Sequence, residues 1–480
     1  MPGIRVNGIY SDNVLLAPKG QEDDDVILEV SPSLTASSRS PRAQYDLFYE
    51  LRNVWRVAEN ETALARHALN ANGRFALAGD RLWVDLTGYM GSFNASAEGP
   101  IASDPGASFV NVAKVRRFSV SPWFRDRLGD SATYLLRYYA AHTAGDINYA
   151  VAKLDQRASA SVEGLARESS PWTWQAHADF QRRDFDGGLS GDRAQSGVRL
   201  YYRVNQELRV FGALDHERIE GVRNRDGDGS GYGPGGGFDW SPNTRTSVGA
   251  SVSRRYYGTV SSARAAYRSA RSTWGLRYSR SILTGSDASL LLIDPQALTS
   301  GEPGAFNPVL EGLVLNRLVP PVNPLLTPGL VTDVAFLDRR LVLFYGLHGA
   351  RNSLIVELFA ADSESTSEFS PTGVVSGIVG SSPAGGVFVG KFRDRGVSAT
   401  HQFRIDPRSS LNLTVNYRAN ASSTADFDTR MTTLQIAHIL RVTRDTLTSL
   451  GVRHSRQTAS GTATSYTENA VFGGIEMRFR

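Results

Sequence analysis

The sequence predicts an all-β protein, a single transmembrane barrel of antiparallel up-and-down strands. Three observations indicate this class: stretches of about ten residues alternate apolar and polar side chains, they recur roughly every 20 residues, and short and long connections take turns between them. Successive side chains of a strand point to opposite faces of its sheet, so each stretch has one apolar face. The chain offers no protein cover for so many apolar faces, and a barrel uses lipid as that cover.

The alternation is clearest in residues 172–181. Trp172, Trp174 and Phe180 share one phase, and Gln175 and Asp179 share the other. The same period of two marks the other stretches that we assign as strands. The clearest of these are residues 26–35, 44–52, 82–90, 133–139, 198–204, 208–215, 274–279, 341–347, 354–358, 411–418 and 471–479.

The connections predict the orientation of the barrel. Short ones lie at 78–81, 204–207, 241–244 and 350–352, and long ones lie at 96–112, 184–195, 217–231 and 361–388. Outer-membrane barrels have short periplasmic turns and long external loops, so both termini are expected on the periplasmic side. The spacing predicts about 22 strands, within a range of roughly 18–24, with short periplasmic turns and long extracellular loops.

Composition excludes several other classes of protein. The chain has 480 residues, no cysteine, and 52 basic against 48 acidic side chains. It therefore has no disulfide or thiolate–metal scaffold, and its charge is too balanced to indicate nucleic-acid binding. It lacks the long apolar run of a helical membrane span. We expect residues 1–480 to form one barrel domain in the bacterial outer membrane, with the signal peptide removed; a cytoplasmic protein is the alternative.

Charged residues in the polar phase of the strands are the candidate pore lining. Charge on the lipid face destabilises a barrel, so these side chains are expected to point inward. One reading is a structural ladder of ion pairs; the other is a mildly basic conduit for anionic or hydroxyl-rich cargo. The candidates are Arg52, Arg137, Arg199, Arg203, Arg209, Arg255, Arg277, Arg404, Arg418, Arg453, Glu29, Asp46, Glu50, Asp85 and Asp179.

One segment, residues 285–339, loses the alternation and becomes apolar and proline-rich. A long irregular segment is usually functional or disordered, and disordered segments are polar. We therefore expect it to pack inside the lumen as a constriction or plug, or on the rim as a cap, because apolar surface favours burial. Its gate candidates are Leu318, Pro320, Pro321, Pro324, Leu325 and Leu326.

Few residues suggest chemistry. Asn224, Asp226 and Asp228 have the spacing of calcium ligands, but the closing acid of such loops is missing, because Gly235 stands twelfth from Asn224. A flexible polar loop is the simpler reading. The scattered histidines form no catalytic triad or zinc spacing. We expect no enzyme activity and no cofactor; Ca²⁺ bound by this surface loop is the alternative.

Aromatic residues occur near the ends of the predicted strands. Barrels place aromatic girdles at both lipid interfaces, so the outward-facing members are expected to form such girdles. The residues concerned are Trp55, Trp83, Trp123, Trp172, Tyr256, Tyr257 and Trp274.

Several segments resemble a known family. They are residues 10–18 (YSDNVLLAP), 26–34 (VILEVSPSL), 118–130 (FSVSPWFRDRLGD) and 336–341 (FLDRRL). Together they resemble the PEP-CTERM (exosortase) system-associated outer-membrane β-barrels, which are related to a second group of β-barrel porins. The resemblance implies a link to exopolysaccharide loci in Gram-negative bacteria and implies no catalytic residues.

These observations lead to a functional expectation. The leading one is a conduit or accessory pore in exopolysaccharide or surface-protein export. The alternatives are a general diffusion porin for small solutes and a plugged scaffold in a cell-surface assembly. The expected partners are outer-membrane lipid and lipopolysaccharide, with polysaccharide or periplasmic export components as further partners and no nucleic acid.

Overall fold

The chain folds into a closed antiparallel β-barrel of 22 strands in a computed structural model. The structure describes residues 1–58, 64–94, 99–145, 154–165, 170–184, 190–220, 229–283, 336–365, 391–422, 427–461 and 463–479. Within these ranges all regular secondary structure is strand. No helix in this part of the chain is long and apolar enough to cross a membrane.

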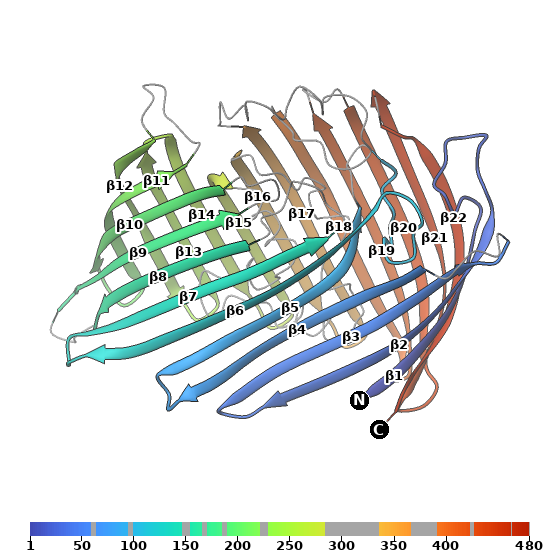
Figure 1. The fold of residues 1–480 in the computed structure, drawn as a ribbon, viewed down its shortest axis with the longest axis horizontal. Helices are drawn as coiled ribbons and strands as arrows, with labels where there is room; N and C mark the ends of the chain where they lie inside the picture. Colours follow the sequence, from blue (N-terminus) through green and yellow to red (C-terminus); the bar gives the residue numbers. More distant parts are fainter. Residues whose placement is uncertain are drawn as a thin grey trace.

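The strands follow one another around the barrel in chain order (Figure 1). Their bounds are β1 Pro2–Ser11, β2 Asp25–Arg39, β3 Ala43–Arg56, β4 Leu64–Ala78, β5 Leu82–Asn94, β6 Val112–Leu128, β7 Ala132–Gly145, β8 Leu154–Gly164, β9 Trp172–Asp184, β10 Ser190–Arg203, β11 Leu208–Ile219, β12 Ser230–Asn243, β13 Thr246–Arg255, β14 Gly258–Arg268, β15 Ser272–Leu283, β16 Phe336–His348, β17 Asn352–Ser365, β18 Lys391–Asp406, β19 Ser409–Ser422, β20 Phe427–Arg441, β21 Thr446–Gly461 and β22 Tyr466–Arg478.

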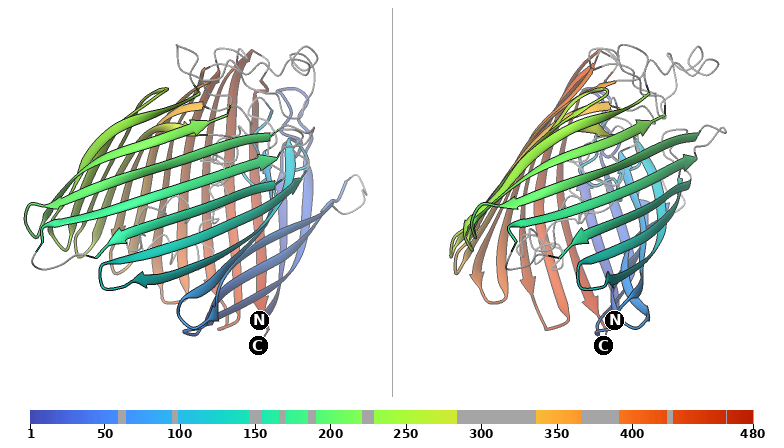
Figure 2. Two further views of the ribbon diagram at one scale, coloured as in Figure 1. Left: turned by 60° about the vertical axis from the view of Figure 1, so that its left-hand side comes forward. Right: turned by 90° about the vertical axis from the view of Figure 1, so that its left-hand side faces the viewer.

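The first and last strands close the barrel. β1 pairs with β2 on one side and with β22 on the other, so that Val6 lies opposite both Val30 and Ile475. Closure leaves no open sheet edge, which an isolated sheet would expose. Both termini lie at the same end of the barrel (Figures 1 and 2). We call this the termini end and the opposite one the loop end.

The connections at the termini end are short, as the sequence predicts. Residues 79–81 and 129–131 join β4 to β5 and β6 to β7. Gly79 and Gly129 adopt φ of 56° and 58°, a conformation that side chains with a Cβ rarely take. Irregular register occurs beside three termini-end turns, in the pairs β4–β5, β12–β13 and β18–β19. These bulges lie where each ladder ends.

The predicted all-β barrel and its count of about 22 strands are confirmed. The expected bounds of the apolar insertion, 285–339, are wrong at one end, because Leu337 pairs with Ile282 and residues 336–339 begin β16. β10 likewise includes residues 190–195, which we expected in a loop. The gate candidates Leu318, Pro320, Pro321, Pro324, Leu325 and Leu326, and the metal candidates Asn224, Asp226 and Asp228, lie outside the described residues.

Candidate functional site

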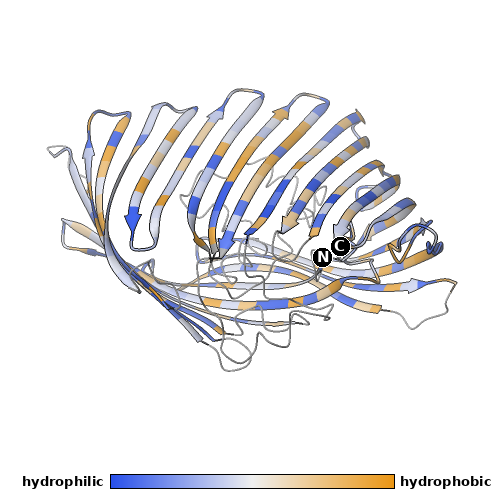
Figure 3. Ribbon diagram, turned by 90° about the horizontal axis from the view of Figure 1, so that it is seen from above, coloured by the Kyte–Doolittle hydropathy of each residue, from blue (hydrophilic) through white to orange (hydrophobic). Residues whose placement is uncertain are grey.

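The barrel has an apolar outer face and a polar inner face. On β2, Leu28 and Leu34 are each 45% exposed, whereas the alternate residues Glu29 and Ser31 are 1% and 0% exposed. Hydrophobic and hydrophilic residues alternate along the strands in the view from above (Figure 3). This is the reverse of a soluble protein, in which exposed large apolar side chains are scattered singly.

Aromatic side chains collect on the outer face at the termini end. Trp172 and Trp274 are 51% and 52% exposed. Their rings contact Tyr202 and Tyr345 on neighbouring strands, with centroids 4.7 and 4.3 Å apart. Amphipathic rings concentrate where hydrocarbon meets polar headgroups, so these pairs have the position of an interfacial girdle.

Trp83 and Trp123 do not join that girdle. They have the phase of the inner face, and their rings stack on each other at 5.7 Å with an interplanar angle of 8°. Arg74 lies over the Trp123 ring and pairs with Asp85, which Arg137 also contacts at 2.7 Å. The inner wall near the termini end therefore carries an aromatic platform edged by charged groups. We call the Trp83–Trp123 pair the tryptophan platform.

Most of the predicted pore-lining arginines form ion pairs on the inner face. The structure brings together two pairs within the predicted set, Arg52 with Glu29 and Arg137 with Asp85, both at 2.7 Å. Four other predicted arginines pair with acids outside that set: Arg209 with Asp239 (2.9 Å), Arg255 with Asp215 (3.0 Å), Arg418 with Asp394 (2.9 Å) and Arg453 with Glu468 (2.7 Å).

The remaining candidates have other surroundings. Asp46, Glu50 and Asp179 pair with Arg39, Arg5 and Arg157. Arg199 lies over the Phe211 ring, and Arg203 donates to the Ser170 carbonyl. Arg277 and Arg404 are exposed and have no ion pair with any residue that the structure describes. The inner face thus carries both ion-paired arginines and arginines without an ion pair to a described residue.

Glycines on alternate strands make room for one of these buried pairs. Across β9 to β12, the register aligns His177, Gly197, Asp215 and Gly233 in one row, and a Cβ on Gly233 would lie 3.5 Å from Arg255 Cα on β13. A Cβ on Gly197 would lie 2.1 Å from Asp215 Oδ1 and 2.8 Å from His177 Cε1. Only the missing side chains let the charged groups meet across the intervening strands. The glycine-rich stretch of β12 therefore serves close packing here.

A loop also enters the barrel. Residues 99–111, which we call the strap, connect β5 to β6 and lie against the inner face of β3, β4, β20 and β21. Arg52 donates to both carboxylate oxygens of Asp104, at 3.0 and 2.9 Å. Arg66 donates to the carbonyl oxygens of Pro105 and Ser108. Two arginines from neighbouring strands thus fix the middle of the strap.

A second set of contacts fixes the first residues of the strap to β21 and β22, beyond the β1–β22 seam at which the barrel closes. The Gln457 amide accepts from Ile101 N at 3.1 Å and donates to Gly99 O at 3.1 Å. The Tyr466 hydroxyl donates to Ile101 O at 2.6 Å. Ile101 is buried against Met431. These backbone groups are satisfied by side chains from β21 and β22, so this end is held as firmly as the middle.

Two loops share a small apolar core. Ala102 and Val110 of the strap pack with Leu16, which belongs to residues 12–24 between β1 and β2, and with Tyr466. Phe109 lies under the Arg56 guanidinium at 5.8 Å. The strap is therefore packed as well as hydrogen-bonded. It narrows the interior on the side of β1, β2 and β22.

The strap carries an acid with a shifted pKa. Burial on its own raises the pKa of the Asp104 carboxyl, but the contacting Arg52 guanidinium and the nearby charges of Arg453 and Arg5 hold that pKa well below its usual range. The carboxylate is therefore ionised throughout the physiological pH range, and the Arg52 ion pair persists with it.

Sequence reasoning missed the strap, although its residues carried a signal. The stretch contains Ile101, Ala102, Ala107 and Phe109 among glycine, proline and aspartate. An apolar loop favours burial, which is the reasoning that we applied to residues 285–339. We placed residues 96–112 among the external loops instead.

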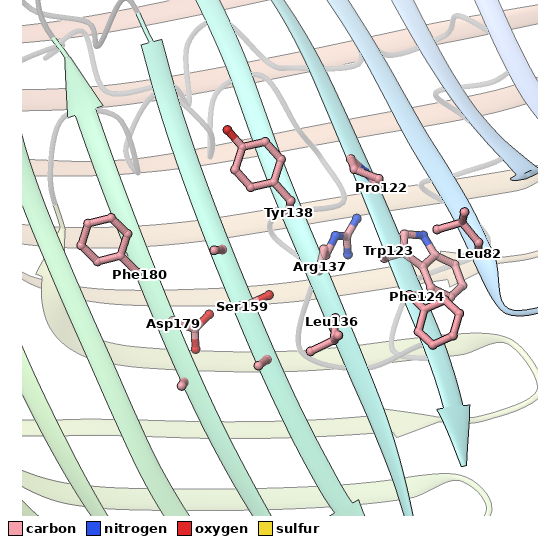
Figure 4. Close-up of a pocket in the computed structure, with 13 residues that line it drawn as sticks. Leu82, Pro122, Trp123, Phe124, Leu136, Arg137, Tyr138, Ser159, Asp179 and Phe180 are labelled. Carbon is pink, nitrogen blue, oxygen red and sulfur yellow. The ribbon is translucent and has the colours of Figure 1, made fainter. Parts of the chain in front are cut away.

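A separate hollow lies on the outer face. Its volume is about 600 Å³, and small side chains of β8 and β9, such as Ala158 and Ala178, form its floor. Figure 4 shows Phe180 on one side and Tyr138, Leu136 and Phe124 on the other. These residues have the outward phase, as most of the lining does, so we assign the hollow to the surface around the barrel. The inward-phase residues Trp123, Arg137, Ser159 and Asp179 complete its lining. No cluster of three potential metal ligands occurs among the described residues.

No protein-family model matches the chain, and no curated protein matches it. Solved structures do. A mutant of the ferric enterobactin receptor PfeA of Pseudomonas aeruginosa is similar over 100% of this chain and 80% of its own, at 8% identity and a TM-score of 0.47. The ferric preacinetobactin receptor BauA of Acinetobacter baumannii is similar over 99% of this chain and 80% of its own, at 9% identity and a TM-score of 0.47. The names of these two receptors indicate no ligand for this chain, because similarity at this level concerns the fold alone.

Proposed function

We propose that the protein is a pore of the Gram-negative outer membrane that passes polar solutes through its lumen. The observation that carries this proposal is the reversed distribution of side chains, with an apolar outer face and ion pairs, amides and hydroxyls inside. Lipid covers an outer face of this kind, and a charged inner face holds water. We assign the termini end to the periplasm and the loop end to the outside of the cell, an orientation that the short turns at the termini end support.

In this proposal the strap narrows the pore. It crosses the inner face from β5 to β21, and side chains on both sides of the β1–β22 seam hold it. Residues 285–335, the predicted insertion without the part that forms β16 and with gate candidates from Leu318 to Leu326, remain our proposal for a second constriction. Removing either element widens the path.

The cargo that we favour is hydroxyl-rich, as in exopolysaccharide export. Two features support this choice besides the family resemblance. The tryptophan platform offers flat apolar surface beside Asp85 and Arg137, and sugars expose both C–H faces and hydroxyl groups to such a surface. The ion pairs leave the wall with little net field, which suits neutral chains better than a single type of ion.

A general diffusion porin is the second candidate. The same pairing of charges favours it, because balanced charges give weak selectivity among small solutes. A plugged scaffold is a third and predicts no conduction. We assign no catalysis and no cofactor to either channel.

Conductance of the purified protein in planar bilayers tests the pore. We expect the wild type to conduct and Asp104→Asn combined with Arg66→Gln to conduct more, because both anchors in the middle of the strap are lost. Asp130→Asn, in the turn of residues 129–131, is the matched control and should behave as wild type. Deletion of residues 287–332 tests the second constriction in the same way. A protein that stays closed in every form refutes the pore and favours the scaffold.

Block of this current by a linear oligosaccharide tests the cargo. Trp123→Ala should weaken the block, since it removes half of the platform, whereas Trp172→Ala on the outer face should leave it unchanged. Equal block of both variants contradicts an oligosaccharide track and leaves the general porin.

A further inference from the structure

Among the described residues, the arginines and lysines on the outer face of the strands are confined to one half of the barrel. In the described strands, outward arginines and lysines occur on β6, β9, β11, β13, β15, β16, β18, β20 and β21, always in the half next to the loop end. In the other half, every described strand arginine has the inward phase. Outward charge costs least close to an interface, but that rule alone allows it at both ends. The one-sided distribution points to an anion on one side.

The outward cations are densest on β15 to β18. There the register aligns Arg280, Arg339, Asp362 and Arg393 in one row across four strands. Lys391 and Arg395 stand two residues on either side of Arg393, in the same exposed phase. Lys391 pairs with Glu364 at 3.2 Å, and Arg393 and Arg395 reach Asp362 only at 3.9 and 4.0 Å. Among the residues that the structure describes here, five cations therefore share two acids.

The Arg280–Arg339 pair lacks a negatively charged partner among the described residues. The two arginines lie directly opposite each other on adjacent strands, an arrangement that destabilises a sheet when both residues carry the same charge. Neither forms an ion pair with a described residue, and the Nε of Arg280 is buried without a hydrogen-bond partner. A bridging phosphate relieves the repulsion, since a guanidinium binds phosphate oxygens in a bidentate manner.

The surface beside this row is apolar. Tyr278 and Leu341, which pair with each other, lie two residues nearer the middle of the membrane than Arg280 and Arg339. Leu341 is 36% exposed, and Leu358 on β17 is 41% exposed. A ligand that fills both regions has a phosphorylated headgroup and acyl chains, which inorganic phosphate lacks.

We propose that Arg280, Arg339 and Arg393 bind the phosphates of an acylated, phosphorylated glycolipid in the outer leaflet, of the lipid A type. The site rests on the proposed outer-membrane location and is independent of conduction through the lumen. Basic groups near a membrane surface strengthen binding of anionic lipid by about fivefold each, so neutralising all three weakens binding on the order of 100-fold.

Native mass spectrometry of the full chain in detergent, with added bisphosphorylated lipid A, tests the site. We expect the wild type to retain the lipid and the triple variant R280Q, R339Q, R393Q to lose it. The matched control is R245Q, R271Q, R351Q, which removes the same charge from exposed turns at the termini end and should bind as wild type. Circular dichroism verifies that each variant is a folded barrel, and R339Q alone, expected to bind about fivefold more weakly, serves if the triple variant does not fold.

Two comparisons identify the ligand. Dephosphorylated lipid A should bind far more weakly than the bisphosphorylated form, and millimolar inorganic phosphate should not displace the latter. The proposal is overturned if the triple variant or R339Q retains lipid A as strongly as the control variant does. It is also overturned if both forms of lipid A bind equally well. Displacement by inorganic phosphate shows a simple anion site instead and overturns the glycolipid. None of these results depends on whether the barrel conducts.

Discussion

Gly197→Ala is the sharpest test of how the inner face is packed. The added Cβ would lie 2.1 Å from Asp215 Oδ1, well inside contact distance, so the carboxylate has to move. Asp215 is 1% exposed, and its other oxygen accepts from Arg255 at 3.0 Å. Rotating the carboxylate away from Cβ also turns this oxygen away from Arg255. Breaking a buried pair in this way costs about 3–5 kcal/mol.

Urea-induced unfolding of the protein in lipid vesicles, followed by tryptophan fluorescence, measures the change. Gly212→Ala on β11 is the matched control, because nothing lies within 4 Å of its added Cβ. We expect the free energy of unfolding to fall by about 3 kcal/mol for Gly197→Ala and to change by less than about 0.5 kcal/mol for the control.

A double-mutant cycle identifies the cause. In an Asp215→Ala background the clash is gone, so Gly197→Ala should cost at least about 2 kcal/mol less than in the wild type. If Gly197→Ala is no worse than Gly212→Ala, or if its cost is the same in both backgrounds, the glycine does not serve the Asp215–Arg255 pair and our reasoning about this row is wrong.

Three further predictions follow from the strap and the ion pairs. Because the pKa of Asp104 is lowered in the folded protein, its ion pair with Arg52 is complete above about pH 4 and is lost as the pH falls further. The conductance of the wild type should therefore rise only below that pH, whereas Asp104→Asn should conduct more at pH 7 and show no further rise in acid. A rise of the wild-type conductance near pH 6 would contradict this. Gln457→Ala removes a buried acceptor and donor, which costs about 1–3 kcal/mol, so amide hydrogen exchange in residues 99–111 should quicken by about tenfold or more, and unchanged exchange would exclude this anchor. Asp394→Asn leaves Arg418 buried without an opposite charge and should lower the free energy of unfolding in urea by about 3 kcal/mol. Asp46→Asn, in an exposed pair, should lower it by under about 1 kcal/mol, and equal losses would show that burial is unimportant here.

The strands were predictable because their information is local. Alternation over 172–181 needs only neighbouring residues, and it correctly separates Trp172 and Phe180 from Gln175 and Asp179. The strap was not predictable in this way. Gln457 and Tyr466, which hold Ile101, are more than 350 positions away in the sequence and show no pattern that refers to it.

Whether an aromatic residue joins the interfacial girdle depends first on whether its strand points it outward or inward, and only then on how near the strand end it lies. Trp83 stands near the start of β5, which suggested the interfacial girdle. The neighbouring Leu82, Val84 and Leu86 take the outward phase, so Trp83 has to point inward. Reading the phase of each aromatic residue would have separated Trp83 and Trp123 from Trp172.

The partners of the inner charges depend on register, which the sequence leaves open. The phase of its strand put Arg255 on the inner face, but only the alignment of β11, β12 and β13 brings it to 3.0 Å from Asp215 across Gly233. The same holds for Arg418 and Asp394, which meet through the β18–β19 register.

The β1–β22 seam has a consequence for the order of folding. Ser11 and Glu468, which bond across it, are separated by 457 positions, so this closure has the greatest loop-closure entropy of any strand pairing in the barrel. The strap depends on the same event, because Gln457 and Tyr466 stand on the last two strands. During biogenesis the first residues of the strap therefore stay unanchored until the C-terminal hairpin arrives, and a chain truncated before β21 would hold the strap only at its middle, through Arg52 and Arg66. Docking of Ile101 is thus a late marker of a completed barrel.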